Sequence, residues 1–164
     1  KKNLEMCADE VSIGEDYQFS LCMFLDAERV EIIRDFFPYY YYMNGASMTM
    51  RHDKTYPDKI QIMRKHLCRI SDAKNIYDLK PQIWNDFVCL LVLHVKGIVY
   101  KQKQVPYRML RREMKQVLSG GDVKEALCQY DMPRLSAAEK LFLFFMKHHM
   151  YAAIWVVVRL YFRS

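Results

Sequence analysis

Glycine and proline are scarce in this chain, with 5 of each among 164 residues. So low a content excludes collagen-like repeats and flexible low-complexity segments, and no internal repeat of solenoid length is present. The hydrophobic share of 52% and the charged share of 27% are instead typical of a globular chain. Its length suffices for one domain with a core of its own.

Cysteine is present but follows no ligand spacing. The five cysteines lie far apart, with no CxxC and no Cys/His pair at metal-binding distance: Cys7, Cys22, Cys68, Cys89 and Cys128. Neither a zinc site nor a disulfide framework is therefore predicted. Free thiols within apolar helical patterns fit a reducing cytoplasm.

A long uncharged apolar run is also missing. Within the apolar C-terminal segment 141–162, the longest uncharged stretch is the nine residues 150–158, which is too short to span a bilayer. A buried bundle helix is the simplest interpretation, and a helix lying in a membrane interface is the alternative. The first eleven residues have no apolar segment typical of a signal peptide. Because they lack an initiator Met, we expect the chain to be part of a longer polypeptide.

Basic residues outnumber acidic ones, giving a formal net charge of +6. Seven Lys or Arg lie between Lys96 and Lys115, against one acid, Glu113. This run indicates either a solvated helix face or attraction to anionic lipid or a pyrophosphate-linked acceptor. No nucleic-acid motif accompanies the charge, so no specific nucleic-acid partner is expected.

Hydrophobic periodicity predicts a mainly helical chain with a short α+β segment near its start. Residues 15–27 are apolar nearly all round, which predicts a buried helix. Residues 29–35 alternate and are β-branched, and residues 37–44 are aromatic and extended, so both are predicted as strands.

From Tyr56 onward the pattern predicts a bundle of about five helices. Pro57 marks the start of the first, Gly120 and Gly121 close the third, and a capping box, Ser136 to Glu139, opens the last. The others are expected over 81–102, 106–121 and 122–131, and the last is expected to run to the end of the chain.

The stretch GEDYQF, residues 14–19, places two acids at the mouth of the first helix. Ser12 and Glu15 have capping-box spacing, and Asp16 in the first turn suits the helix dipole, so a purely structural role is one interpretation. The other is functional: a carboxylate held ionised at a helix N-terminus is a well-positioned general base, and Gly14 permits close approach. Spacing alone does not separate the two.

Residues 11–49, VSIGEDYQFSLCMFLDAERVEIIRDFFPYYYYMNGASMT, closely resemble the end of the catalytic domain of bacterial family 2 glycosyltransferases of the GT-A type. That family has Gly-Glu-Asp, an apolar helix, a strand, an aromatic strand ending in Tyr-Tyr-Arg-x-Asn, and a Ser-Met/Ile-Thr/Ser turn. The corresponding residues here are Gly14-Glu15-Asp16, Tyr39 to Asn44, and Ser47-Met48-Thr49. The resemblance covers the first third of the chain.

The resemblance implies an inverting transferase that moves a sugar from a nucleotide-sugar donor to the hydroxyl of a saccharide or lipid-linked acceptor, in surface polysaccharide biosynthesis. Asp16 would be the general base and Glu15 would support it or bind the acceptor. Gly14, Asn44 and Ser47 would line the substrate site. Arg51 would meet the pyrophosphate, and His52 would meet the pyrophosphate or the metal.

Two departures from the family pattern bear on this interpretation. Tyr42 stands where the family has Arg, so that phosphate contact is not carried over. No Asp-x-Asp metal motif occurs in the 164 residues. The divalent metal, Mn or Mg, and the nucleotide-binding half are therefore expected in the full-length enzyme, and this fragment alone is expected to be inactive and to hold no metal.

The sequence thus predicts two regions. Residues 1–52 form the acceptor-side end of the catalytic domain, and residues 53–164 form a C-terminal helical region. The expected location is cytoplasmic, with peripheral attachment to the inner face of the plasma membrane and self-association left open. A basic helical adaptor or membrane-surface module without catalysis is the alternative function.

Overall fold

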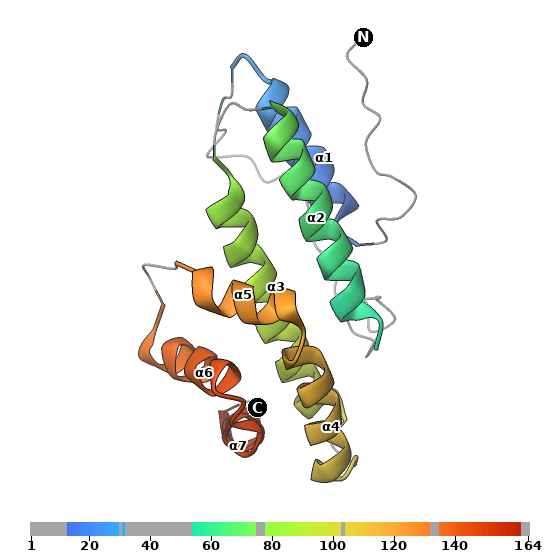
Figure 1. The fold of residues 1–164 in the computed structure, drawn as a ribbon, viewed down its shortest axis with the longest axis vertical. Coiled ribbons are helices and arrows are strands. Elements are labelled where there is room, and N and C mark those ends of the chain that lie inside the picture. The colour runs from blue at the N-terminus through green and yellow to red at the C-terminus, as the bar shows by residue number, and fades with distance from the viewer. Residues whose placement is uncertain are drawn as a thin grey trace.

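The computed structural model describes residues 13–29, 31, 54–74, 78–102, 104–131 and 135–161, without the side chains of residues 15, 16, 101 and 161. These residues form helices (Figure 1). The helices are α1 (Glu15–Asp26), α2 (Tyr56–Lys74), α3 (Lys80–Lys101), α4 (Tyr107–Leu118), α5 (Gly121–Gln129), α6 (Ala137–Lys147) and α7 (Tyr151–Tyr161).

The mainly helical fold is confirmed, and four predicted helices appear within a few residues of their expected bounds, as α2, α3, α4 and α5. Pro57 lies at the second position of α2, where its missing N–H costs no hydrogen bond. The described residues contain no strand. The predicted strands at 29–35 and 37–44 lie outside the described residues, except for Arg29 and Glu31.

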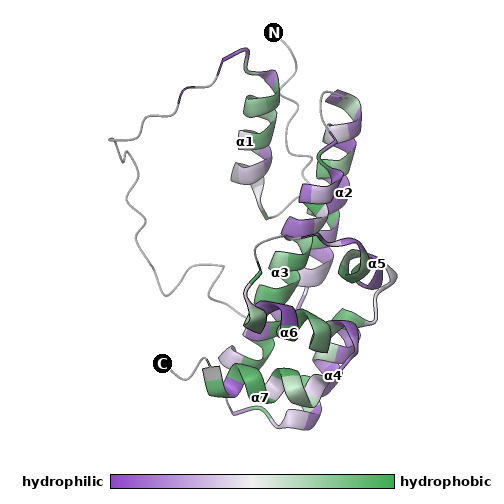
Figure 2. Ribbon diagram, turned by 90° about the vertical axis from the view of Figure 1, so that its left-hand side faces the viewer, coloured by the Kyte–Doolittle hydropathy of each residue, from purple (hydrophilic) through white to green (hydrophobic). Residues whose placement is uncertain are grey.

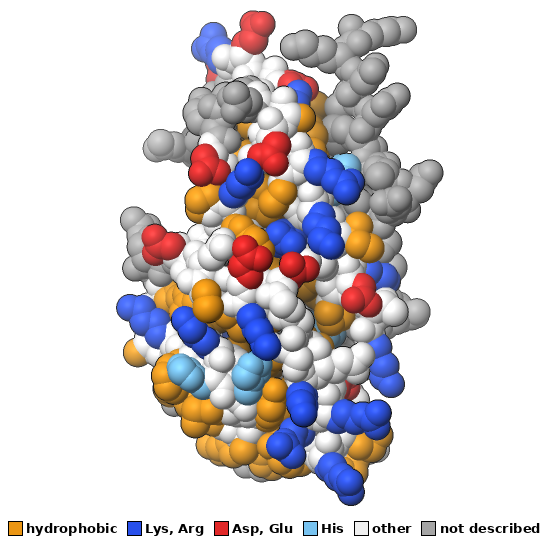
Figure 3. Space-filling view, in the orientation of Figure 1, with side chains coloured by type: hydrophobic (Ala, Val, Ile, Leu, Met, Phe, Trp, Pro, Cys, Tyr) orange, Lys and Arg blue, Asp and Glu red, His pale blue; other side chains and the backbone are white. Residues whose placement is uncertain are grey.

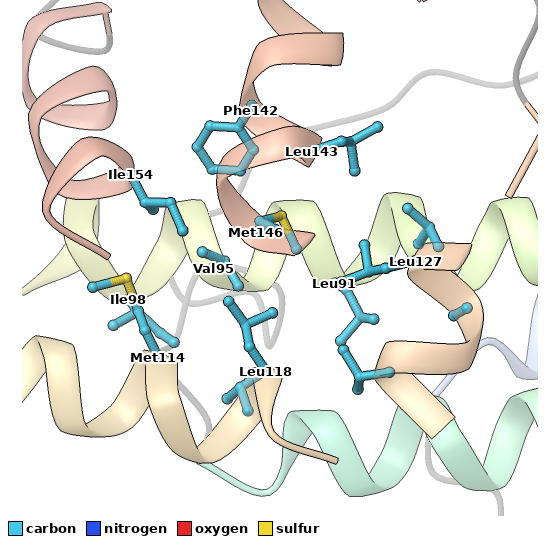
Figure 4. Packing of buried hydrophobic residues seen from close by; sticks show 14 of the residues in the cluster. Leu91, Val95, Ile98, Met114, Leu118, Leu127, Phe142, Leu143, Met146 and Ile154 are labelled. Atoms are coloured by element: carbon cyan, nitrogen blue, oxygen red, sulfur yellow. The ribbon is translucent and has the colours of Figure 1, made fainter. Parts of the chain in front are cut away.

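Helix α3 is the centre of the bundle, because α2, α4, α5 and α7 all pack against it. Figure 4 shows Leu91, Val95 and Ile98 of α3 facing apolar side chains from α4, α5, α6 and α7. By length and composition Lys80–Tyr100 is apolar enough to cross a membrane. One face of this helix, however, forms the core.

The prediction of one continuous last helix is wrong. The segment forms two helices, α6 and α7, which are separated by His148–Met150. His149 has a left-handed backbone, with φ 53, which turns the chain without glycine. The amide N–H of Met150 donates to the carbonyl of Phe145 at 2.9 Å and closes this turn. The break lets α6 pack on α5 while α7 packs on α3 and α4. The capping box is confirmed, since Glu139 N–H donates to Ser136 Oγ at 3.3 Å and Ser136 N–H donates to Glu139 Oε2 at 2.8 Å.

The prediction that the first helix is buried on all sides is also wrong. Helix α1 packs on α2, and among its side chains that the structure describes, those of residues 17–26, only Gln18 and Cys22 are buried. Phe19, Met23 and Phe24 are 51%, 50% and 62% exposed. One side of α1 is therefore apolar and exposed, and no described element covers it.

Candidate functional site

Gly14 is held at the start of α1 by two independent constraints. It is the N-cap residue and has a left-handed conformation, with φ 72 and ψ 25, that L-residues with a side chain rarely adopt. A Cβ at this position would lie 2.4 Å from Sδ of Met63 on α2. The Gly14 carbonyl accepts from the Gln18 amide at 2.9 Å, which opens the helix. The left-handed turn therefore favours glycine, whereas a side chain here would in addition only require the flexible end of Met63 to move.

Glu15 and Asp16 are the first two residues of α1, directly after this turn. The predicted capping box at Ser12 is wrong, because the N-cap is Gly14 and Glu15 is therefore the first helical residue, not the third. As a glycine, the N-cap residue has no side chain with which to cap the helix. An acid at these positions is stabilised in its ionised form by the helix dipole.

The first turn of α1 is tied to the central helix. The Tyr17 hydroxyl donates to Asp86 Oδ2 on α3 at 2.7 Å, and Gln82 Nε2 donates to the other oxygen, Oδ1, at 2.8 Å. Partial burial and the hydrogen bond to the Asp86 carboxylate raise the pKa of Tyr17. At the far end of α1, Lys74 of α2 pairs with Asp26. These contacts fix where α1 begins relative to α2 and α3.

Gln18 belongs to this site and was missed by the sequence analysis. It is fully buried one turn after the acids, and neither its amide nitrogen nor its amide oxygen has a hydrogen-bond partner. Unsatisfied buried amides are rare in proteins and call for an explanation. The signal in the sequence was a side-chain amide within an apolar stretch of the helix, four residues after Gly14.

The other predicted site residues, Asn44, Ser47, Arg51 and His52, lie outside the described residues. The structure therefore does not bring them together with Gly14 or place them elsewhere. Over the part of the chain that it describes, no group of three or more His, Cys, Asp or Glu side chains is arranged to hold a metal ion.

A second concave site lies between α2, α3, α4 and α5, with a volume of about 590 Å³. Its polar side chains include Gln61, His94 and Glu113, and Lys54 is among the lining residues. The His94 ring stacks on Tyr56, with centroids 5.2 Å apart, and Gln102 Nε2 donates to Glu113 Oε2 at 3.0 Å. Gly14 is not among the described residues that line this cavity. It is thus separate from the mouth of α1.

Comparisons of the chain with protein-family models, with curated proteins and with solved structures found no match. The function must therefore be argued from the residues and their geometry.

Proposed function

We propose that this chain carries the acceptor-side end of an inverting glycosyltransferase, with Asp16 as the general base and Glu15 as its neighbour in the acceptor site. The single observation that carries the proposal is the position of the two acids, at the start of a helix and directly after a left-handed glycine. The resemblance of residues 11–49 to family 2 glycosyltransferases supplies the reaction type.

The chemistry follows from that position. Inversion needs one base, on the face of the sugar opposite the leaving nucleotide, to take the proton of the attacking hydroxyl. The proton passes from the acceptor oxygen to the Asp16 carboxylate, the new bond forms to the anomeric carbon, and the bond to the nucleotide phosphate breaks. A carboxylate kept ionised by the helix dipole is ready to accept that proton.

Rigidity of the helix start also supports the proposal. Tyr17 is bonded to Asp86, and the close approach of Gly14 to Met63 sets the first turn against α2. A base carried on a fixed stretch of backbone avoids part of the entropic cost of aligning it at each turnover.

In the proposed enzyme, Gly14, Asn44 and Ser47 line the substrate site. Arg51 meets the pyrophosphate, and His52 meets the pyrophosphate or a divalent cation. The nucleotide-binding half comes from a preceding part of the protein. The exposed apolar side of α1, formed by Phe19, Met23 and Phe24, suits a helix that packs against such a neighbouring part.

The test is donor turnover by the native, full-length polypeptide from its source cells. It is purified with an antibody to this segment, sized, and incubated with a panel of nucleotide sugars and divalent metal. We expect a polypeptide heavier than 19.7 kDa by at least a domain that releases nucleotide from one donor. A native polypeptide of 19.7 kDa that releases nucleotide from no donor would rule the proposal out.

A further inference from the structure

One end of the bundle combines positive charge with exposed apolar side chains. Helix α4 buries Leu110, Met114, Val117 and Leu118 against the core. Its opposite face carries the exposed cations Arg108, Arg111, Arg112 and Lys115. Basic side chains gather at this end of the molecule in Figure 3, over the region where α4 lies in Figure 1.

Acidic side chains do little to neutralise this face. The one acid of α4, Glu113, is half-buried and accepts a hydrogen bond from Gln102. Helix α7, which packs against α4, contains no acid. Within the described part of the chain, no ion pair is found for the four cations of α4. The positive charge of Arg108, Arg111 and Lys115 is therefore directed outward, while Arg112 borders the cavity that Asp58 and Asp122 also line.

Apolar side chains are exposed on the same two helices and the turn between α6 and α7. Met109 of α4 is 62% exposed and Leu160 of α7 is 63% exposed, and Met150 and Val156 are also exposed. Ala152, Val156 and Leu160 repeat every four residues, so they form one stripe opposite the buried Ile154 and Val158. Figure 2 shows α7 as predominantly hydrophobic along its length.

The two helices that carry the cationic and apolar groups are in contact. The rings of Tyr107 on α4 and Trp155 on α7 meet edge to face, with centroids 5.7 Å apart. A shallow hollow is lined by Arg111 together with His149, Met150 and Tyr151. The cations of α4 and the apolar residues of α7 thus border one another at this end of the bundle.

We propose that the end of the bundle formed by α4 and α7 docks on the surface of an anionic lipid membrane. Lys and Arg side chains attract acidic head groups, and exposed Met, Val and Leu side chains enter the boundary between head groups and acyl chains. With 11 residues, α7 is about 16 Å long and does not span the hydrocarbon layer, so it lies in the interface. A nucleic acid would satisfy the cations but would leave the aliphatic stripe of α7 in water.

This surface lies on helices other than α1 and does not depend on the proposed transferase activity. It extends the sequence-based alternative for segment 141–162, because it is the break at His148–Met150 that places α7 beside α4. A catalytic chain and a chain without catalysis would both use it to hold the protein at a membrane.

The test is co-sedimentation of the 164-residue chain with vesicles of equal parts phosphatidylglycerol and phosphatidylcholine, compared with vesicles of phosphatidylcholine alone. We expect strong binding to the anionic vesicles only. The triple variant Arg108→Gln/Arg111→Gln/Arg112→Gln should bind about 100-fold more weakly, since each cation near a charged bilayer contributes roughly a fivefold factor. The matched control, Lys65→Gln/Arg69→Gln/Lys124→Gln, removes the same charge from exposed positions on α2 and α5 and should bind within about threefold of the parent.

A second variant separates insertion from charge attraction. Met109→Ser/Leu160→Ser changes two exposed residues outside the core, leaves every charge in place, and should weaken binding about tenfold. Circular dichroism of each variant checks that the helices remain. The proposal is overturned if the parent chain does not bind anionic vesicles. It is also overturned if the control variant loses as much affinity as the triple Arg→Gln variant, or if the Met109→Ser/Leu160→Ser variant binds as tightly as the parent.

Discussion

Single residues at the start of α1 carry most of the functional argument, and Gly14 is the one whose role is most constrained. Its left-handed backbone opposes any side chain, and a Cβ there would also displace the flexible end of Met63. Glycine before an acid pair was visible in the sequence, but the αL conformation and the neighbour on α2 were not. They depend on how two helices 40 residues apart in the chain pack together.

Substituting Gly14 with Ala should lower the free energy of unfolding by about 2 kcal/mol, because the αL conformation alone costs about 1–2 kcal/mol and the new Cβ displaces Met63. Urea denaturation of the chain measures the change. Gly121→Ala is the control: no atom lies within 4 Å of its Cβ and its φ is not positive, so Ala there should be neutral or stabilising. Equal losses in both variants would contradict the account of Gly14.

Gln18 is the residue whose burial is hardest to justify by stability. Because both polar atoms of its amide lack partners, Gln18→Leu should raise the free energy of unfolding by about 1–3 kcal/mol in urea denaturation. Gln116→Leu, at an exposed position of α4, should change it by no more than about 0.5 kcal/mol. A less stable Gln18→Leu chain would mean that the amide is satisfied in solution. If Gln18→Leu makes the proposed full-length transferase more stable but slows sugar transfer, the Gln18 amide serves the acceptor site and not the stability of the fold.

At the scale of whole helices, periodicity predicted most of what is seen. The apolar stripe of α2 and the apolar run of α3 placed both helices correctly, because their burial follows the helical repeat. The break between α6 and α7 was not predictable by the same rule, since His148-His149-Met150 contains neither Gly nor Pro. The exposure of α1 was missed because composition reports how apolar a helix is, but not which neighbours are present to cover it.

The capping box of α6 leads to a prediction about pH. Hydrogen bonds from Ser136 lower the pKa of Glu139 below its ordinary value of 4.5, so folding favours the ionised carboxylate. Its stabilising effect should be present above pH 4.5 and lost as the pH falls through the lowered pKa. The melting temperatures of the parent and of Glu139→Gln should therefore differ at neutral pH and converge in acid. A difference in melting temperature that persisted in acid would contradict the stabilising role of the ionised Glu139 carboxylate.

Ser136→Ala tests the same cap from the other side. Removing the hydroxyl that accepts from the Glu139 amide should cost about 1 kcal/mol at neutral pH, measured by thermal denaturation. Ser119→Ala is a useful comparison, since the Ser119 hydroxyl bonds only to the Lys115 carbonyl at the end of α4 and caps no helix start. A loss in Ser119→Ala as large as that in Ser136→Ala would contradict the special role of the box.

Helix α3 offers a matched pair for the core. Leu91 is fully buried at the meeting point of several helices, whereas Leu93, two residues later, is 61% exposed. Leu91→Ala should cost about 2–5 kcal/mol, because it removes buried methyl groups and leaves a cavity. Leu93→Ala should stay within about 0.5 kcal/mol. Chemical denaturation measures the loss of stability in both variants. A larger loss in Leu93→Ala than in Leu91→Ala would mean that the core packs on the other face of α3.

For the molecule as a whole, the described helices form a bundle around α3, with the acid pair at the mouth of α1 and the basic, apolar surface on α4 and α7. The bundle was predictable from sequence because it rests on repeated burial. The two proposed sites differ in how far the sequence indicates them. Gly14, Glu15 and Asp16 share a motif in one short stretch, whereas the α4–α7 surface depends on packing between segments that periodicity treats separately.

The measurement that bears most directly on the central claim is the rate of sugar transfer by the proposed full-length transferase with Asp16→Asn. Asparagine keeps the shape of the side chain but accepts a proton poorly, so kcat should fall by about 100-fold or more while the melting temperature stays within a few degrees of the parent's. Glu28→Gln, which neutralises an exposed acid beyond the end of α1, should transfer sugar at the parent rate. Transfer by Asp16→Asn at a rate near that of the parent would contradict the assignment of Asp16 as the base.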